Sequence, residues 1–398
     1  MKTLIELFDD CQIENIVTGL KFLPEKIIFV GFKETMKRNK TEALERLFSL
    51  KKIQIEFEYE VVGRYNYNDI VNKLNLIIDK NEDCCFDLTG GKELVLVAMG
   101  EVASKRNIPM IQMNIKTGEL IPVKYEGPSP KNTNPSLSIE ESIILNGGSI
   151  IHGGTDYNWQ LTDDFVKDIR LVWNINKEDS RLWNKQSRVF SVLDKAGKVD
   201  DDYSTFVDRK KLPTDELFFD DGIINNLKEN GLLKMFDVSE DAVRFKFKNN
   251  QVKELISKAG NTLELYLYSI MQNIPSLYND IDISVIIDWD GVIHDQRNSV
   301  KDTRNEIDIL ATKNLIPIFI SCKNGEVHKE ALYELNSVAE RFGGEYSKKF
   351  LFATYLSLDA NSKMHILQRA KDMNIEIISG IDKLCEYELI SIIKSKIK

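Results

Sequence analysis

Two stretches in the last third of the chain decide its fold: Asn305-Glu306-Ile307-Asp308-Ile309-Leu310 and Ile318-Phe319-Ile320-Ser321-Cys322-Lys323-Asn324. Both have the composition of short apolar strands that include a chemically active group. Alternation predicts that Asp308 lies on the opposite face of its strand from Ile307 and Ile309. A carboxylate and the ammonium group of a neighbouring strand can together hold a divalent cation, a water and a phosphate. The two stretches therefore predict a site for metal-dependent phosphodiester cleavage.

The composition limits what else the chain does. Its 398 residues suffice for two or three domains, and a hydrophobic fraction of 42% supports real cores. The formal net charge is -9, so any nucleic-acid site must be a focused patch, because phosphate binding needs local positive potential. Five scattered cysteines without a CxxC pair favour reduced thiols. With no signal-like N-terminus and no long apolar run, we expect a cytoplasmic protein with no membrane partner.

The first third of the chain alternates between strand and helix signals. Repeated βα units with short loops predict a parallel sheet covered by helices, which is a Rossmann-like architecture. The expected strands are 3–8, 26–30, 53–62, 84–88 and 109–113, and the expected helices are 12–20, 41–50, 67–80 and 94–105.

A segment rich in Pro, Ser and Asn at 127–135 marks a domain boundary. The signals beyond it are mixed, but a helix at 225–231 and strand-like segments at 232–234 and 243–247 favour a winged-helix-like module. Strand and helix signals then alternate again to the end of the chain. We therefore expect an α/β protein with a Rossmann-like domain at 1–126, a linker and winged-helix-like module at 127–258, and a second α/β domain at 259–398.

A glycine-rich turn, Asp87-Leu88-Thr89-Gly90-Gly91-Lys92, lies where an expected strand ends and a helix begins. Glycines let a backbone approach a ligand closely, and the N–H groups at a helix start attract phosphate. The turn is neither GxGxxG nor a Walker sequence, which argues against a dinucleotide cofactor, a nucleoside triphosphate and a Rossmann oxidoreductase. An ordinary βα turn is the alternative interpretation.

The turn resembles the Thr-Gly-Gly signature of the CRISPR-associated Rossmann-fold (CARF) sensor domains, although a residue usual between the second glycine and the lysine is missing. Gln12-Ile13-Glu14-Asn15-Ile16 also resembles the loop after their first strand. The resemblance covers residues 1–126 and implies a homodimer that binds one cyclic oligoadenylate at its twofold axis. Gln12 and Asn15 could instead be helix surface. The residues that the resemblance places in the pocket are Phe8, Asp9, Gln12, Asn15, Gly31, Thr89, Gly90, Gly91 and Lys92.

Glu264, Asp308 and Lys323 occur in the order helix, strand, next strand, which resembles the restriction-endonuclease-like PD-(D/E)xK fold. In that family the carboxylates hold Mg²⁺ or Mn²⁺, and the lysine orients the attacking water or stabilises the phosphate. Ser321 replaces the usual acidic residue, so Glu306 or the Cys322 carbonyl would complete the oxygen ligands. Singly, the three residues could be an exposed helix residue, a turn cap and a strand end. The resemblance implies the catalytic residues Glu264, Asp308 and Lys323, and the metal ligands Asp308, Glu264, Glu306 and Cys322.

Positive charge gathers in the last third, where it could guide a nucleic-acid backbone, although a basic run is usually a solvated face. Tyr346, Phe350 and Phe352 could stack bases, with core packing as the alternative for the two phenylalanines. The cations are Arg297, Lys301, Arg304, Lys313, Lys323, Lys329, Arg341, Lys348 and Lys349.

The whole chain resembles the ancillary nucleases of type III CRISPR defence that join these two domains. The resemblance implies activation by cyclic tetra-adenylate and metal-dependent cleavage of DNA, RNA or both, in single-stranded form. A second hypothesis is a ligand-gated transcription regulator, in which the winged helix binds DNA and the last domain is a degraded scaffold. The Ser321 departure supports that second hypothesis.

Overall fold

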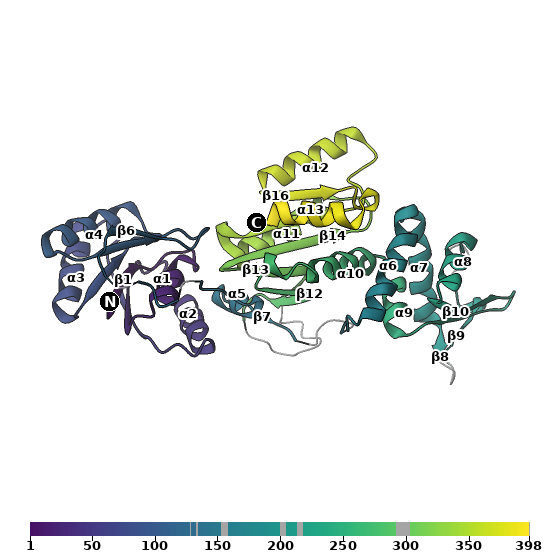
Figure 1. The fold of residues 1–398 in the computed structure, drawn as a ribbon, viewed down its shortest axis with the longest axis horizontal. Helices are drawn as coiled ribbons and strands as arrows, with labels where there is room; N and C mark the ends of the chain where they lie inside the picture. Colours follow the sequence, from purple (N-terminus) through teal and green to yellow (C-terminus); the bar gives the residue numbers. More distant parts are fainter. Residues whose placement is uncertain are drawn as a thin grey trace.

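The computed structural model describes residues 1–127, 129–132, 134–152, 158–199, 204–212, 218–291 and 303–397. The expected α/β class is confirmed, with two six-stranded sheets and one four-stranded sheet. The N-terminal sheet and the four-stranded sheet lie at opposite ends of an elongated molecule, with the C-terminal sheet between them (Figure 1). Within the described residues, no helix has the length and apolar character needed to span a membrane.

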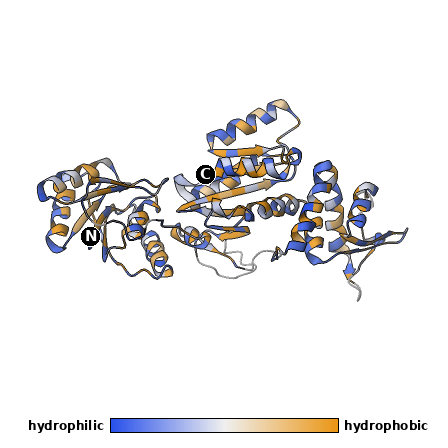
Figure 2. Ribbon diagram, viewed as in Figure 1, coloured by the Kyte–Doolittle hydropathy of each residue, from blue (hydrophilic) through white to orange (hydrophobic). Residues whose placement is uncertain are grey.

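The N-terminal domain is a doubly wound sheet with the strand order β3-β2-β1-β4-β5-β6. All neighbours pair in parallel except β5 and β6, which are antiparallel. Apolar strands lie between helices with hydrophilic outer faces (Figure 2). The elements are β1 Thr3–Leu7, α1 Glu14–Phe22, β2 Lys26–Gly31, α2 Arg38–Leu50, β3 Glu56–Val61, α3 Tyr67–Lys80, β4 Cys84–Asp87, α4 Glu93–Arg106, β5 Met110–Met113 and β6 Leu120–Lys124.

The C-terminal sheet has the order β16-β15-β14-β13-β12-β7. Its edge strand β7 belongs to the segment expected in the middle module, because Ser149 and Ile150 pair with Asp288 and Ile287 of β12. The chain thus enters this domain before it forms the middle module. The elements are α5 Ile139–Leu145, β7 Ser149–Ile150, α10 Ala259–Gln272, β12 Asp280–Asp288, β13 Arg304–Lys313, β14 Ile316–Lys323, α11 Lys329–Gly343, β15 Lys348–Ala353, α12 Ala360–Asp372, β16 Ile375–Ser379 and α13 Glu386–Ile397.

The middle module packs helices against a small antiparallel sheet of order β10-β11-β9-β8. A helix followed by the β10–β11 hairpin matches the expected helix and wing. Two long helices, α6 and α7, precede them and were not expected from the sequence. The elements are α6 Asp163–Glu178, α7 Ser180–Ala196, β8 Lys198–Val199, β9 Thr205–Asp208, α8 Asp221–Glu229, β10 Leu233–Val238, β11 Ala242–Phe247 and α9 Asn250–Ser257.

Strict alternation fails along β13. Ile309 packs in the core that includes α10 and α13, whereas Ile307 packs in the core that includes α11 and α12. The prediction that both isoleucines share a face is therefore wrong, because the strand changes face at Asp308. Across from Asp308 on β12, Ser284 has a left-handed φ of 53°, so the neighbouring strand is irregular at the same level.

Candidate functional site

The structure brings Asp308 and Lys323 together in the C-terminal domain. Lys323 is the last residue of β14, and its Nζ lies 4.0 Å from Oδ2 of Asp308 on β13. The two side chains are 35% and 18% exposed, so both combine partial burial with access to solvent. A partly desolvated acid and amine at this distance interact more strongly than a surface pair would.

Asp308 is held where β13 and β14 separate. The pairing of the two strands runs from Lys313–Ile316 to Ile309–Ile320 and ends there. Beyond that point, Oδ2 of Asp308 accepts the backbone N–H of Cys322 at 2.6 Å and the hydroxyl of Ser321 at 3.1 Å. The carboxylate replaces a strand carbonyl as the acceptor, which fixes its position without a neighbouring acidic residue.

Glu264, on the first turns of α10, belongs to the same charged group. Its pKa is raised to about 8 by burial first, and then by the negative charges of Asp308 and Glu306, with Lys323 and Lys258 acting in the opposite direction. The negative charges of Asp308 and Glu306 raise the proton affinity of Glu264, because like charges disfavour ionisation. A bound cation relieves that repulsion, so this donor set suits a hard divalent ion.

The other expected ligands differ in how they meet the site. Glu306 is exposed and reaches Glu264 through its charge. Cys322 is buried among apolar residues, and it directs its backbone N–H to Asp308. The Cys322 carbonyl as a metal ligand stays a prediction. Ser321 stands where the PD-(D/E)xK pattern has an acidic residue, and its hydroxyl donates to the carboxylate of Asp308.

Three asparagines next to the site were missed by sequence reasoning. Nδ2 of Asn324, the residue after Lys323, donates to Oδ1 of Asn176 at 2.9 Å, to Oδ1 of Asn184 at 3.2 Å and to the carbonyl of Ala259 at 3.1 Å. Asn176 lies on α6 and is fully buried, Asn184 lies on α7, and Ala259 begins α10. The network ties the end of β14 to the middle module. Asn324 is 148 positions from Asn176 and 140 from Asn184, so no local pattern indicates the network.

Several of the expected cations lie away from the site. Lys313, Lys348 and Lys349 lie at the opposite end of the sheet from Lys323, because β14 and β15 run in parallel from that end. The ammonium groups of all three donate to carbonyl or amide oxygens of the chain. Burial lowers the pKa of Lys348 and of Lys349. These lysines are structural donors, and a substrate path must use other cations.

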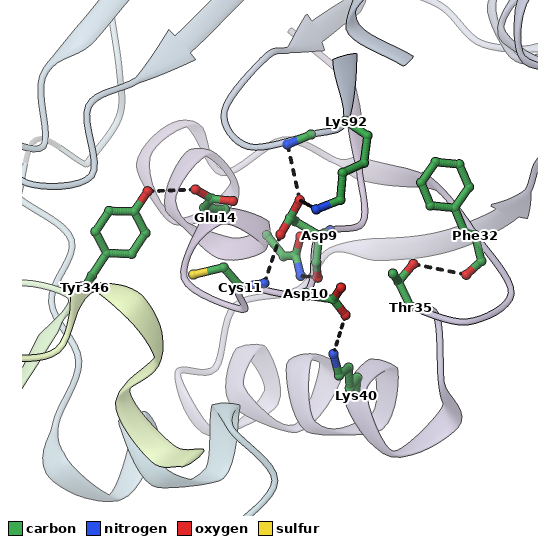
Figure 3. Close-up of polar contacts among 11 residues, drawn as sticks. Asp9, Asp10, Cys11, Glu14, Phe32, Thr35, Lys40, Lys92 and Tyr346 are labelled. Carbon is green, nitrogen blue, oxygen red and sulfur yellow. Dashed lines mark hydrogen bonds and ion pairs between the residues drawn. The ribbon is translucent and has the colours of Figure 1, made fainter. Parts of the chain in front are cut away.

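The aromatic candidates are also engaged elsewhere. Phe350 and Phe352 are buried in the core, as the alternative interpretation expected. Tyr346 donates its hydroxyl to Oε1 of Glu14 in the N-terminal domain at 2.7 Å (Figure 3). Arg297 and Lys301 lie outside the described residues.

A second candidate site lies in the N-terminal domain, at the point where the strand order reverses between β1 and β4. Ligands of doubly wound sheets bind at such switch points, beyond the carboxyl ends of the strands. Asp9 follows β1, and Gly90 and Gly91 follow β4 with φ values of 70° and 107°. A cavity of about 640 Å³ opens there, and it is also lined by Arg341 at the end of α11 and by Glu345 just after that helix. The cavity therefore lies between the N-terminal and C-terminal domains.

Five of the nine expected pocket residues line this cavity: Asp9, Gln12, Gly90, Gly91 and Lys92. Gln12 is only 5% exposed, and within the described residues neither its Nε2 nor its Oε1 has a hydrogen-bond partner. A buried amide without partners costs free energy unless a ligand or water satisfies it. The Gln12 amide is therefore a position where a water or a polar ligand atom would lower the free energy.

The other four expected residues lie behind the cavity wall. Asn15 accepts the N–H of Asp9 at 2.7 Å and donates to its carbonyl at 2.9 Å, so it holds the loop in shape. Thr89 donates its hydroxyl to Asp87, while its Oγ1 accepts the N–H of Met113 at 2.7 Å. Phe8 is a core residue, and a Cβ on Gly31 would lie 3.0 Å from that of Phe8. These four positions support the turn and are not among the residues that line the cavity.

Two cations that line the cavity are held by carboxylates, whereas a third, Arg341, donates to the carbonyls of Asn146 and Trp289. Lys92 lies 3.9 Å from Oδ2 of Asp9, and Lys40 lies 2.8 Å from Oδ1 of Asp10 (Figure 3). Gly91 also donates its N–H to Asp9 at 3.3 Å. A phosphate could take the place of these two carboxylates, because the same N–H and ammonium groups would then donate to its oxygens.

No protein-family model matches the sequence, and no curated protein is similar to it in sequence. Solved structures do share the fold across the whole chain. Protein VC1899 from Vibrio cholerae superposes with a TM-score of 0.74 at 15% identity, covering 99% of this chain and 97% of its own. Can2 from Sulfobacillus thermosulfidooxidans, solved in complex with cyclic tetra-adenylate, gives a TM-score of 0.71 at 14% identity, covering 100% and 99%. The arrangement of all three units is therefore that of Can2 and VC1899.

Proposed function

We propose that this protein is a metal-dependent endonuclease of type III CRISPR defence that cyclic tetra-adenylate activates. The observation that supports the nuclease assignment best is the shared environment of Glu264, Asp308 and Lys323. These residues come from a helix and two strands, and the charges of Asp308 and Lys323 both act on the buried carboxyl of Glu264. The fold shared with Can2, which binds cyclic tetra-adenylate, supports the choice of activator.

Asp308 and Glu264, with Glu306 in support, would hold Mg²⁺ or Mn²⁺, which would polarise the scissile phosphate as a Lewis acid. The Ser321 hydroxyl and the Cys322 N–H orient Asp308 by donating to its Oδ2. Lys323 Nζ donates to the attacking water or to a phosphate oxygen, which stabilises the negative charge that develops.

In the N-terminal domain, the loop of Asp9 and the turn of Gly90 and Gly91 would bind the phosphates of the activator. Two copies related by a twofold axis offer two identical cradles to a symmetric cyclic tetranucleotide, so we propose a homodimer. The Gln12 amide would supply directional hydrogen bonds, because both of its polar atoms lack other partners among the described residues.

The N-terminal domain contacts the hairpin that holds the proposed cleavage site, so ligand binding in the cavity can be coupled to cleavage. The turn that joins β13 to β14 packs Leu315 into the N-terminal core, together with Leu137 and Leu145. The same hairpin contributes Asp308 and Lys323. A shift of the N-terminal domain therefore moves the strands that hold the catalytic pair. The hydrogen bond between Glu14 and Tyr346 is a second link between the domains.

The direct test is to incubate the protein with labelled single-stranded DNA or RNA and Mn²⁺, with each ring size of cyclic oligoadenylate in turn. Cleavage that requires cyclic tetra-adenylate supports the proposal. Absence of cleavage in every combination would refute it.

The transcription-regulator hypothesis loses support from the middle module. The helix before a wing normally enters the major groove of DNA and needs a basic surface. Here that helix is α8, which begins with Asp221 and ends with Glu229 after a single cation, Lys228. Lys228 itself donates to the carbonyl of Phe236. An acidic helix at this position does not suit a phosphate backbone.

A further inference from the structure

Helix α7 has an unusual concentration of positive charge on its exposed side. Its four basic residues, Arg181, Lys185, Arg188 and Lys195, are all exposed, and we call them the α7 cation stripe. At about 100° per residue they fall within an arc of about 80°. The opposite face, which includes Trp183 in the core, is buried. The four cations therefore form one line along about four turns of helix.

This line is not neutralised by the protein. Among the described residues, no carboxylate forms an ion pair with any member of the stripe. The one acidic side chain of α7, Asp194, lies 3.2 Å from Lys253 of α9. Elsewhere the chain pairs its helical cations at i and i+4, as in Arg38–Glu42. Like charges at that spacing, such as Arg181 and Lys185, repel one another and destabilise a helix. Apart from the contact of Arg181 with the Tyr355 ring, the described residues offer the stripe no compensating partner, so it is free to bind an anionic ligand.

The stripe begins beside the proposed cleavage site. Asn184, one turn into α7, donates to the carbonyl of Asn324, the residue after Lys323. The guanidinium of Arg181 lies 5.7 Å from the ring centre of Tyr355. The preceding residue, Thr354, donates its N–H to the carbonyl of Lys323 at 3.2 Å. Two independent contacts thus fix the first turn of α7 against the end of β14.

We propose that the α7 cation stripe binds the phosphate backbone of the substrate strand and leads it to Asp308 and Lys323. The inference rests on the proposed nuclease function and names the surface that holds its substrate. A strand bound along α7 places successive phosphates against Arg181, Lys185, Arg188 and Lys195, and its end enters the site at Asn324. This focused patch resolves how a chain with a net charge of -9 binds nucleic acid. The stripe takes the role of substrate binding that the sequence had suggested for Lys313, Lys348 and Lys349, whose ammonium groups donate to oxygens of the chain.

The test uses a triple variant of the full-length protein, Lys185→Gln, Arg188→Gln and Lys195→Gln. Glutamine has nearly the helix propensity of lysine and arginine, so α7 is expected to form. Affinity for a labelled single strand, measured by fluorescence anisotropy with activator and EDTA, is expected to fall about 10- to 100-fold at about 100 mM salt. The slope of log K against log salt is expected to fall by about 2, at about 0.7 for each lost phosphate contact. In cleavage assays with Mn²⁺, KM rises by a similar factor and kcat stays within about twofold.

The matched control removes the same charge from another surface: Lys363→Gln, Lys371→Gln and Lys394→Gln, all at exposed helical positions of the C-terminal domain. It is expected to behave as the unmodified protein does. Both variants should bind cyclic tetra-adenylate normally, which shows that they fold. If the unmodified protein cleaves the strand and the stripe variant matches the control in affinity and salt slope, the stripe inference is wrong and the nuclease function stands. If the unmodified protein neither binds nor cleaves any strand, both fail.

Discussion

The two six-stranded sheets place their functional groups in different ways. The N-terminal sheet presents loops beyond the ends of β1 and β4, where backbone N–H groups and glycines face a cavity. The C-terminal sheet presents side chains from within β13 and at the end of β14, where the strands separate. The first arrangement suits a large anionic ligand that must bind and leave, and the second suits chemistry on one phosphate.

The difference sets what a substitution should do in each sheet. A loop built from backbone donors tolerates loss of one side chain but not a change of backbone conformation. A pair of charged side chains depends on each member. The four predictions below separate the two sheets on that basis.

The largest effect is expected from Lys323→Ala. It removes the only ammonium group within 4.0 Å of Asp308 among the described residues. Cleavage is expected to fall about 10²- to 10³-fold, because a preorganised charge at the reacting phosphate is lost. Binding of cyclic tetra-adenylate, measured by calorimetry, should not change. Equal loss of both activities would mean that the two sheets do not act separately.

A substitution that changes the backbone conformation of the N-terminal turn is expected to weaken activator binding instead. Gly90 has a φ of 70°, and a Cβ there would lie 2.5 Å from Oε2 of Glu14, which Tyr346 already binds. Gly90→Ala should weaken the activator about tenfold, since both the turn and Glu14 must move. Gly118→Ala is the control, because Gly118 has a φ of 69° and nothing within 4 Å of the new Cβ. Both variants should lose about 1 kcal/mol of stability, but only the first should alter activation.

The sequence predicted some elements well for a physical reason. Helix α3, at Tyr67–Lys80, matches the expected range because its buried positions, Ile70, Leu74, Ile77 and Ile78, are all apolar. Helices α6 and α7 were not expected, because their buried faces include the polar residues Asp168, Asn176, Gln186 and Ser187. A buried polar residue interrupts the periodicity on which helix prediction depends.

The two candidate sites show a similar division. Asp308, Lys323 and Glu264 were predicted from their residue types and order, and the structure brings them together. Pocket lining was harder to predict, since a residue beside a glycine-rich turn can either face the ligand or hold the loop. Asn15 does the latter, and no local pattern distinguishes the two roles.

A pH measurement tests how the N-terminal sheet holds its turn. Glu6 and Asp87, on the neighbouring strands β1 and β4, are each 1% exposed. Burial, followed by the charge of Asp87, raises the pKa of Glu6 well above its usual value. A raised folded-state pKa means that stability is full below the unfolded pKa, about 4.3, and falls as pH rises above it, by up to about 1.4 kcal/mol per unit.

Glu6→Gln should therefore lose less free energy of unfolding between pH 5 and pH 8 than the unmodified protein does, in urea titrations at the two values. Glu34→Gln, at an exposed position, is the control and should follow the unmodified protein. An identical pH dependence of the Glu6→Gln variant would show that Glu6 ionises normally in the folded state.

The smallest effect is expected at Ser321, where the sequence differs from the PD-(D/E)xK pattern that it resembles. Ser321→Ala removes one of two hydrogen bonds to Oδ2 of Asp308 and leaves the Cys322 N–H in place. A loss of about 1 kcal/mol should raise the Mn²⁺ concentration for half-maximal cleavage about fivefold. Ser321→Asp distinguishes a supporting role from a lost ligand. If the serine only supports Asp308, a second carboxylate 3 Å away repels it and weakens Mn²⁺ further than alanine does. If position 321 is instead a metal-ligand position, Ser321→Asp strengthens Mn²⁺ binding. The serine would then be a poorer ligand in the place of the usual carboxylate.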